Sequence, residues 1–409
     1  MGCTTSTMAC LRAAACCPSH KASTDRHRDM HDIAGNGHDT SSSSPLSTSS
    51  SSSSVSSSSS SQTYEPRSPK PPFHSRYDMT HGPLGAGATA SVHRAIHRET
   101  GVAVAVKCFV KAHMQLDGVA DLFREVNVLQ TLAHPAIVAF VDLFDEPDVY
   151  FLVLELVDGG DLFDRLALKK VYSERDAQCL VRALLEVVQY LHQLNIVHQD
   201  LKPENILLVT SDDDTSIKLC DFGFAQYDTD IQLSRKCGTT DYMAPEVLAQ
   251  PTHGREADIW SIGVITYILL CGYAPFHGKT RAAIEAAIQN GAFEFHAEYW
   301  DDASPAARSF VRRMLVTDPY ERATVDELLA DTWLARPASS VSFQTTIPQL
   351  RRFNARRKFK SAVAAVAATV AFRAAGRSRG MSALEDLSEA TIVEETTNHT
   401  ELRADQMNQ

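Results

Sequence analysis

The sequence lacks the features that mark several other classes of protein. Acidic residues outnumber basic ones, 50 against 39, and the net charge of −11 argues against a nucleic-acid-binding protein, which is normally basic. No apolar run approaches the ~20 residues of a transmembrane helix. The longest candidate, Ala362 to Phe372, is short and rich in alanine. The first residues contain no long apolar segment of the kind that forms a secretory signal.

The cysteines are scattered and do not suggest a disulfide framework or a metal site. There are nine of them, an odd number, and no two have the C-x-x-C spacing. This usage indicates free thiols in a reducing, intracellular compartment. A calcium-binding loop is also absent, because Asp212 to Asp214 is followed by neither the glycine nor the closing glutamate of such a loop.

Composition divides the chain into parts. Residues 1–76 contain the nearly pure serine tract from Ser41 to Ser61 and too little apolar surface to offset the entropy of ordering, so we expect a disordered tether. From Tyr77 onward, alternating apolar residues and glycines indicate strands and turns. After Ser173, apolar residues spaced three and four apart indicate helices. A basic stretch, 335–375, and an acidic tail, 376–409, follow this region.

A glycine-rich turn from Gly85 to Val92 is the first candidate for phosphate binding. Such a turn lets backbone N–H groups approach phosphate oxygens without obstruction by side chains. Alone this signal is weak, since a plain hairpin turn has the same composition. The buried-strand pattern from Val104 to Lys107 strengthens it, because it ends in a cation that can pair with nucleotide phosphates.

Three further motifs follow in order along the chain. They are His198-Gln199-Asp200-Leu201-Lys202-Pro203-Glu204-Asn205, Asp221-Phe222-Gly223 and Ala244-Pro245-Glu246. Each motif is short, but their order and spacing together are specific. Over residues 77–334 the chain resembles the eukaryotic serine/threonine protein kinases. The resemblance implies an α+β, two-lobed protein kinase fold, with a small β-rich lobe before a larger helical lobe. It also implies transfer of the γ-phosphate of ATP, with Mg²⁺, to serine or threonine of protein substrates.

The resemblance assigns catalytic roles to individual residues. Asp200 matches the aspartate that accepts the proton of the substrate hydroxyl, and Lys202 matches the lysine that steadies the transferred phosphate. Glu125 matches the glutamate that pairs with the nucleotide-binding lysine, Lys107. Asp258 resembles the aspartate that braces the catalytic loop.

The same resemblance defines the expected nucleotide site. Asn205 and Asp221 match the two positions that hold magnesium. The adenine slot should be apolar, with backbone groups fixing the orientation of the ring. The matching positions are Leu84, Val92, Ala105, Leu154 and Leu207 for the slot, Gly85 and Gly87 for the phosphate loop, and Glu155 to Val157 for the hinge. Glu246 and Arg322 resemble the buried ion pair of the family.

Three departures from the family pattern concern the phosphate loop and the activation loop. Ala90 replaces the third glycine and Thr89 an aromatic residue, so we expect weaker ATP affinity. Gln199 replaces the arginine that binds a phosphate on the activation loop, and Arg235 stands where relatives switched by that phosphate carry threonine. We therefore hypothesise that activity does not require phosphorylation of the activation loop.

The basic stretch resembles the regulatory segment of calcium/calmodulin-dependent protein kinases. Many cations without an acid, followed by spaced apolar residues, are typical of a basic amphipathic helix that binds calmodulin or a membrane surface. A solvated basic helix is the plain alternative. The residues expected to bind calcium-loaded calmodulin are Phe353, Arg356, Arg357, Lys358, Phe359, Val363, Val366 and Phe372.

The same group of kinases suggests how the segment acts. Without calmodulin, residues 339–359 are expected to cover the substrate groove. Thr346 matches a self-phosphorylated threonine of some relatives, but Phe343 replaces the arginine before it. Asp161 and Glu204 match positions that accept a substrate arginine, which predicts targets with arginine about three residues before the serine or threonine.

The first six residues, Met1-Gly2-Cys3-Thr4-Thr5-Ser6, fit the pattern for N-myristoylation at Gly2. One acyl chain binds membranes only marginally, so a second chain on Cys3 is expected to stabilise the anchor. We therefore predict a monomeric kinase tethered to the cytoplasmic face of a membrane, with a cytoplasmic fraction. Two alternatives remain open: a membrane-tethered pseudokinase scaffold, and an active kinase whose basic helix responds to anionic lipid.

Overall fold

The computed structural model describes residues 71–86, 90–210, 215–228, 240–249, 254–343 and 345–376. Among the predicted residues, Gly2, Cys3 and Gly87 lie outside these ranges, as do Arg235 and the acidic tail. The side chains of Val366 and Phe372 are also outside the description, although their backbone is helical. None of the helices in the described ranges is long and apolar enough to cross a membrane.

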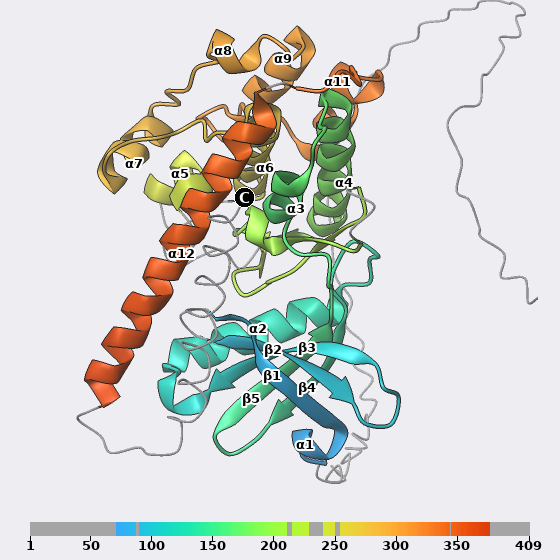
Figure 1. Ribbon diagram of the computed structural model, residues 1–409, viewed down its shortest axis with the longest axis vertical. Helices are drawn as coiled ribbons and strands as arrows, with labels where there is room; N and C mark the ends of the chain where they lie inside the picture. The colour runs from blue at the N-terminus through green and yellow to red at the C-terminus, as the bar shows by residue number, and fades with distance from the viewer. Residues whose placement is uncertain are drawn as a thin grey trace, which may run out of the picture. The chain divides into compact units, whose positions relative to one another are not determined.

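An antiparallel five-stranded sheet forms the amino-terminal part, in the order β1-β2-β3-β5-β4. Val104 and Val106 alternate with less buried neighbours along β3, which is the period expected of a strand with one face against a core. Helix α2 packs beside the sheet and contacts β4 (Figure 1). The elements are α1 (Phe73–Arg76), β1 (Tyr77–Ala86), β2 (Ser91–His97), β3 (Ala103–Val110), η1 (Lys111–His113), α2 (Leu116–Thr131), β4 (Phe140–Asp145) and β5 (Val149–Glu155).

Residues 73–76, which composition assigned to the tether, form helix α1 against the sheet. Phe73 is fully buried, and its ring stacks on Phe151 with centroids 4.3 Å apart. Tyr77 and Phe144 complete this aromatic cluster. Composition did not predict this contact, because Phe73 is a single aromatic residue in a serine-rich and proline-rich context. Its burial among aromatic rings holds the short helix α1 against the sheet.

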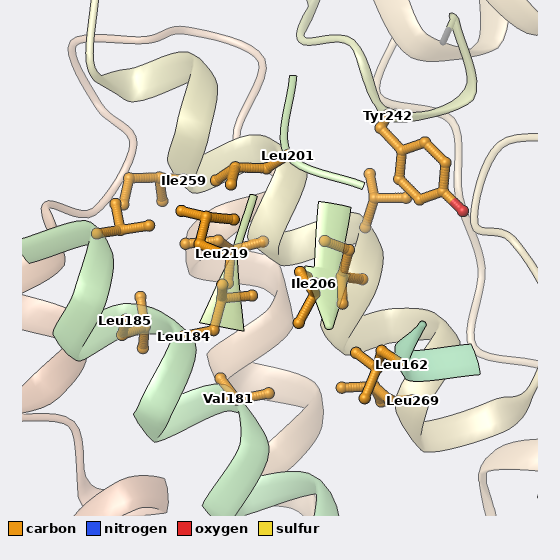
Figure 2. Packing of buried hydrophobic residues seen from close by; sticks show 14 of the residues in the cluster. Leu162, Val181, Leu184, Leu185, Leu201, Ile206, Leu219, Tyr242, Ile259 and Leu269 are labelled. Atoms are coloured by element: carbon orange, nitrogen blue, oxygen red, sulfur yellow. The ribbon is translucent and has the colours of Figure 1, made fainter. Parts of the chain in front are cut away.

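Helices dominate the carboxyl-terminal part. Helix α6 is apolar on every side and almost completely buried, which is the expected location for such a helix. Figure 2 shows part of the buried cluster to which Ile259 of α6 belongs, together with Leu184, Ile206 and Leu219. The elements are α3 (Leu162–Leu168), α4 (Glu174–Gln193), β6 (Ile196–Val197), η2 (Pro203–Asn205), β7 (Ile206–Leu208), β8 (Ile217–Leu219), β9 (Gln226–Tyr227), η4 (Thr240–Tyr242), α5 (Pro245–Ala249), α6 (Glu256–Cys271), α7 (Arg281–Gln289), α8 (Ala297–Trp300), α9 (Pro305–Met314), α10 (Val325–Leu329), α11 (Thr332–Ala335) and α12 (Thr346–Gly376).

The long helix α12 packs by its first turns on α3 and α6 (Figure 1). Ile347 and Leu350 are buried there, and the hydroxyl of Thr346 donates a hydrogen bond to the Leu270 carbonyl at 3.0 Å. Gly272 ends α6 with a φ of +85°, and a Cβ at this position would lie 2.5 Å from the Thr346 carbonyl oxygen. Only glycine therefore allows this close approach of α6 and α12.

Candidate active site

Lys107 lies at the centre of a charged cluster between the sheet and the catalytic loop. Its Nζ lies 2.9 Å from Oε1 of Glu125 on α2 and 2.8 Å from Oδ1 of Asp221. Strand β3 presents the lysine and α2 presents the glutamate, so the two elements must be closely packed for the contact to form. The structure thus brings together three residues that are up to 114 positions apart in the sequence.

Electrostatics keep Lys107 and Asp221 charged. Burial alone would lower the pKa of Lys107, but the negative charges of Glu125 and Asp221 outweigh it and raise that pKa. Burial opposes ionisation of Asp221 as well, and the positive charge of Lys107 nevertheless holds the pKa of Asp221 below its usual value. An ammonium ion and an ionised carboxylate are therefore ready beside each other at neutral pH.

Asp258 braces the catalytic loop from within the core. Its side chain is completely buried, and its two carboxylate oxygens accept hydrogen bonds from the backbone N–H of His198 at 3.0 Å and of Gln199 at 2.9 Å. His192 on α4 contacts the same carboxylate at 3.0 Å. Gln199 has a φ of +66°, a conformation that is unfavourable for a non-glycine residue. The two hydrogen bonds to Asp258 hold the loop in this conformation.

The loop places three polar residues together. Lys202 pairs through Nζ with the carboxylate of Asp200. The side-chain amide of Asn205 donates to the Asp200 carbonyl at 2.8 Å and to its carboxylate at 3.1 Å. Asp200 is thus a buried carboxylate held by two donors on its own loop. Phe222, which follows Asp221 in the sequence, is fully buried against the ring of His198. This contact fixes the segment that carries Asp221.

Four of the five residues expected to line the adenine slot lie on strands of the five-stranded sheet, and the fifth lies on β7 of a separate sheet. Ala105 on β3 pairs with Leu154 on β5, and Val92 on β2 pairs with Lys107 on β3. Leu84 on β1 is mostly exposed, and Leu207 lies on β7. The carboxylate of Glu155 contacts Lys218 at 2.8 Å and accepts a hydrogen bond from the Ala139 N–H, so its side chain is occupied by structural contacts.

A buried ion pair joins Glu246 of α5 to Arg322. Both guanidinium Nη atoms of Arg322 donate to the carboxylate of Glu246, at 2.6 and 2.9 Å. The guanidinium also donates to the Glu256 carbonyl and lies 5.1 Å from the Trp260 ring. The charge of Arg322 is therefore fully paired despite complete burial.

Another charged group surrounds Arg357 of α12, where this helix packs on α3. Both Asp161 oxygens accept hydrogen bonds from Nη2 of Arg357, each at 2.8 Å. Nη1 of the same arginine lies 3.2 Å from Glu204, and Nη2 lies 3.6 Å from Asp164. Asp161 also caps α3 by accepting from the N–H groups of Phe163 and Asp164. A residue of α12 thus occupies the position expected for a substrate arginine.

Comparison with known proteins places these features in a family. A model of the protein kinase domain matches residues 79–334. The chain belongs to the protein kinase family. It is similar to calcium/calmodulin-dependent protein kinase type 1 of Macrobrachium nipponense, with 40% identity over 288 residues, which cover 69% of this chain and 83% of the relative. The corresponding protein of Caenorhabditis elegans is 39% identical over 304 residues, 74% of this chain and 87% of the relative.

A human relative, calcium/calmodulin-dependent protein kinase type IV, is 40% identical over 300 residues, covering 73% of this chain and 63% of the relative. These similarities confirm that the chain is a serine/threonine protein kinase related to that group. The expected α+β architecture is also confirmed, with an antiparallel sheet before a helical region. Protein kinases typically use ATP and Mg²⁺.

Two residues beside Arg357 were not predicted from the sequence. Asp164 was not predicted, although it follows Asp161 by one helical turn and shares its face. Asn354 donates to Asp164 at 2.7 Å and accepts from Nε of Arg357 at 2.9 Å. Its place in a run of cations gave no signal for this contact. Of the residues predicted to bind calmodulin, Phe353 lies partly buried against Phe163, whereas Phe359 is largely exposed.

Proposed function

We propose that this kinase is switched by α12, which occupies the substrate groove until calcium-loaded calmodulin removes it. The observation that carries the proposal is Arg357, which is only 10% exposed and is paired with Asp161 and Glu204. Those carboxylates are the expected acceptors of a substrate arginine. A basic substrate and α12 therefore compete for the same charges.

The residues of the active site support phosphoryl transfer to a hydroxyl group. In the proposed roles, Asp200 accepts the hydroxyl proton while the new O–P bond forms, ADP leaves, and Lys202 stabilises the charge of the transferred group. Lys107, held by Glu125, contacts the nucleotide phosphates. Phosphoryl transfer depends mainly on positioning and charge stabilisation, which this cluster of fixed charges provides.

Asn205 and Asp221 fit a magnesium site. Mg²⁺ prefers oxygen ligands. The amide nitrogen of Asn205 is engaged with Asp200, which directs the amide oxygen to a ligand role. Asp221 supplies a carboxylate whose lowered pKa keeps it ionised. Bound Mg²⁺ would neutralise the phosphate charges, and these two residues would hold it.

Phosphorylation of an Arg-x-x-Ser peptide by the purified full chain tests these roles. The wild type should transfer phosphate from ATP, and Asp200→Asn should reduce kcat by at least roughly 10²-fold, as expected for removal of a catalytic base. A folded wild-type protein without activity at saturating ATP and Mg²⁺ would contradict the proposed roles and favour a scaffold.

Calmodulin is the partner that the exposed side of α12 fits. Phe359 and Val363 are 72% and 51% exposed, one helical turn apart, beside several cations. An apolar and basic helix face suits the acidic, methionine-rich groove of calmodulin. The relatives' names refer to calcium and calmodulin, in agreement with this partner.

Calcium-dependent binding to calmodulin can be measured by calorimetry. Phe359→Ala should weaken binding by at least roughly tenfold, which corresponds to the loss of one large apolar anchor. Leu168→Ala on α3 is the matched control, because Leu168 is equally exposed (71%) but lies outside α12. Equal binding by both variants, or binding only to anionic vesicles, would transfer the regulatory role to another partner.

We further propose that Gly2 and Cys3 are acylated and tether the kinase to the cytoplasmic face of a membrane through the serine-rich segment that precedes α1. The sequence pattern at the amino terminus supports this proposal. Gly2→Ala should move the protein from the membrane fraction to the supernatant. An unchanged distribution would contradict it.

A further inference from the structure

The segment that joins α3 to α4 combines large exposed apolar side chains with cations. Its sequence is Leu168-Lys169-Lys170-Val171. The side chains of Leu168 and Val171 are 71% and 61% exposed, and the two lysines lie between them. A single exposed apolar residue is common on a protein surface, whereas a group of them bordered by polar residues marks an interaction site.

Contacts on both sides hold this segment in place. Leu166 before it and Tyr172 after it are fully buried. Arg351 of α12 binds the segment through its guanidinium group, which donates from Nε to the Ala167 carbonyl at 2.7 Å and from Nη2 to the Lys169 carbonyl at 3.0 Å. The backbone is therefore fixed where α12 packs on α3 (Figure 1), and the exposed apolar side chains cannot retract into the core.

Two further residues extend the same surface. Arg351 is itself exposed and adds a third cation beside the two lysines. Val341 is 74% exposed and lies in a neighbouring segment, which is joined to this one by the hydrogen bond from the Phe343 N–H to the Tyr172 carbonyl at 2.8 Å. We call this surface the apolar–basic patch; it consists of Leu168, Lys169, Lys170, Val171, Val341 and Arg351.

The carboxylates nearest to the patch in the sequence bind other partners. Asp164 contacts Lys358 at 2.9 Å on the other side of α3. Glu174 is 1% exposed, and Asp176 accepts a hydrogen bond from the Ser173 N–H at 2.7 Å in the cap of α4. These acids therefore do not neutralise the patch, which is locally positive although the whole chain carries a net charge of −11.

An anionic membrane is the partner that this combination fits. Cations are attracted to the negative surface of the cytoplasmic leaflet, and apolar side chains beside them can enter the boundary between headgroups and acyl chains. A stable protein interface needs about 20 residues on each side, far more than the patch contains. A basic patch is also the second signal that makes weak anchoring by a single acyl chain stable.

We propose that the apolar–basic patch docks the kinase on membranes that contain anionic lipid. This inference goes beyond the proposed switch and requires neither acylation of Gly2 nor displacement of α12. The patch begins at the last residue of α3, and Asp161 caps the first turn of the same seven-residue helix, roughly 10 Å away. A kinase docked by the patch therefore holds its substrate groove close to the membrane surface.

The test is co-sedimentation of the full chain with lipid vesicles, using Gly2→Ala protein so that acylation at this residue cannot contribute. It should bind vesicles of phosphatidylcholine with phosphatidylserine much better than vesicles of phosphatidylcholine alone, and high salt should weaken this binding. The double variant Lys169→Glu, Lys170→Glu should lower the partition coefficient by at least roughly tenfold. The double variant Leu168→Ala, Val171→Ala should lower it several-fold, because less apolar surface enters the membrane.

Two further double variants carry the same change in net charge at other exposed positions. Lys279→Glu, Arg281→Glu lies at the start of α7, and Arg356→Glu, Lys360→Glu lies on the rival basic surface of α12. Both should retain most of the vesicle binding. Urea unfolding of every variant should match that of the parent, because exposed side chains contribute little to stability.

Three results would overturn the inference. The first is a parent protein that does not bind the anionic vesicles, which would leave the patch to an acidic protein surface. The second is parent-like binding by both patch variants. The third is an equal loss in the α7 or α12 variant, which would show that net charge or the α12 cations determine the binding.

Discussion

Replacement of Arg357 by alanine should release the kinase from its requirement for calmodulin. The arginine makes two charge-assisted hydrogen bonds to Asp161, each at 2.8 Å, and one looser contact to Glu204. Hydrogen bonds to charged groups contribute about 1.5–3 kcal/mol each. Glu204 is about a third exposed, so solvent screens its share. A total of about 3 kcal/mol shifts the ratio of closed to open enzyme by roughly 100-fold.

The assay compares initial rates on an Arg-x-x-Ser peptide in chelator and in calcium with calmodulin. Arg357→Ala should raise the calcium-free rate by roughly 10- to 100-fold, limited by the fully stimulated rate. Lys358→Ala is the matched control, because Lys358 pairs with Asp164 but is 61% exposed. An exposed pair contributes at most about 1 kcal/mol, or roughly fivefold.

Two results would refute this reasoning. The first is an Arg357→Ala enzyme that is as dependent on calmodulin as the wild type, which would show that the ion pair does not hold α12 in place. The second is equal activation by both variants, which would show that net charge matters more than the particular pocket.

Four further predictions follow from the charged groups. Asp221→Asn should lower kcat by at least roughly 10²-fold in the peptide assay, because it removes a magnesium ligand and a partner of Lys107; a smaller loss would contradict this role. In urea titrations, Arg322→Ala should lower the free energy of unfolding by about 3–5 kcal/mol, since it leaves a buried carboxylate unpaired. Replacement of the exposed Arg281 by alanine is the control and should change this free energy by less than about 0.5 kcal/mol. Equal effects of the two variants would contradict the role of the buried ion pair. Phosphatase treatment should not reduce the rate of peptide phosphorylation, because Arg255 already holds the activation segment through an ion pair with Asp228 at 2.7 Å. A loss of this rate that rephosphorylation restores would contradict the hypothesis that the activation loop needs no phosphate. Burial lowers the pKa of His198 in the folded protein, so the imidazole binds a proton more readily in the unfolded chain. The free energy of unfolding should therefore be retained above about pH 6.5 and fall as the pH decreases below it. His198→Asn should weaken this pH dependence.

The residues proposed for the active site could be grouped from the sequence because their motifs combine residue type with strict local spacing. Asp200, Lys202 and Asn205 lie on one loop, so the sequence alone places them together. The contacts of Lys107 with Glu125 and Asp221 cross long stretches of chain, and there the prediction depended on resemblance to the family. The structure supplies the distances that the motifs could not.

The regulatory contacts could be predicted only in part. The composition of the basic stretch indicates a helix with a cationic face, but not which cation enters the groove. That choice depends on the rotation of α12, which is fixed by Ile347 and Leu350 against the helical core. Arg357 was therefore grouped with the calmodulin-binding residues although it lies in the acidic pocket.

In the proposed switch, α12 blocks the substrate groove and calcium-loaded calmodulin removes it. The most direct measurement is the rate of Arg-x-x-Ser phosphorylation by the wild-type full chain, with and without calcium and calmodulin. The rate should be low in chelator and rise at least roughly tenfold when calcium and calmodulin are both present, as expected when an arginine contact of this kind is released. Equal rates in the two conditions, from a folded enzyme at saturating ATP and Mg²⁺, would contradict it.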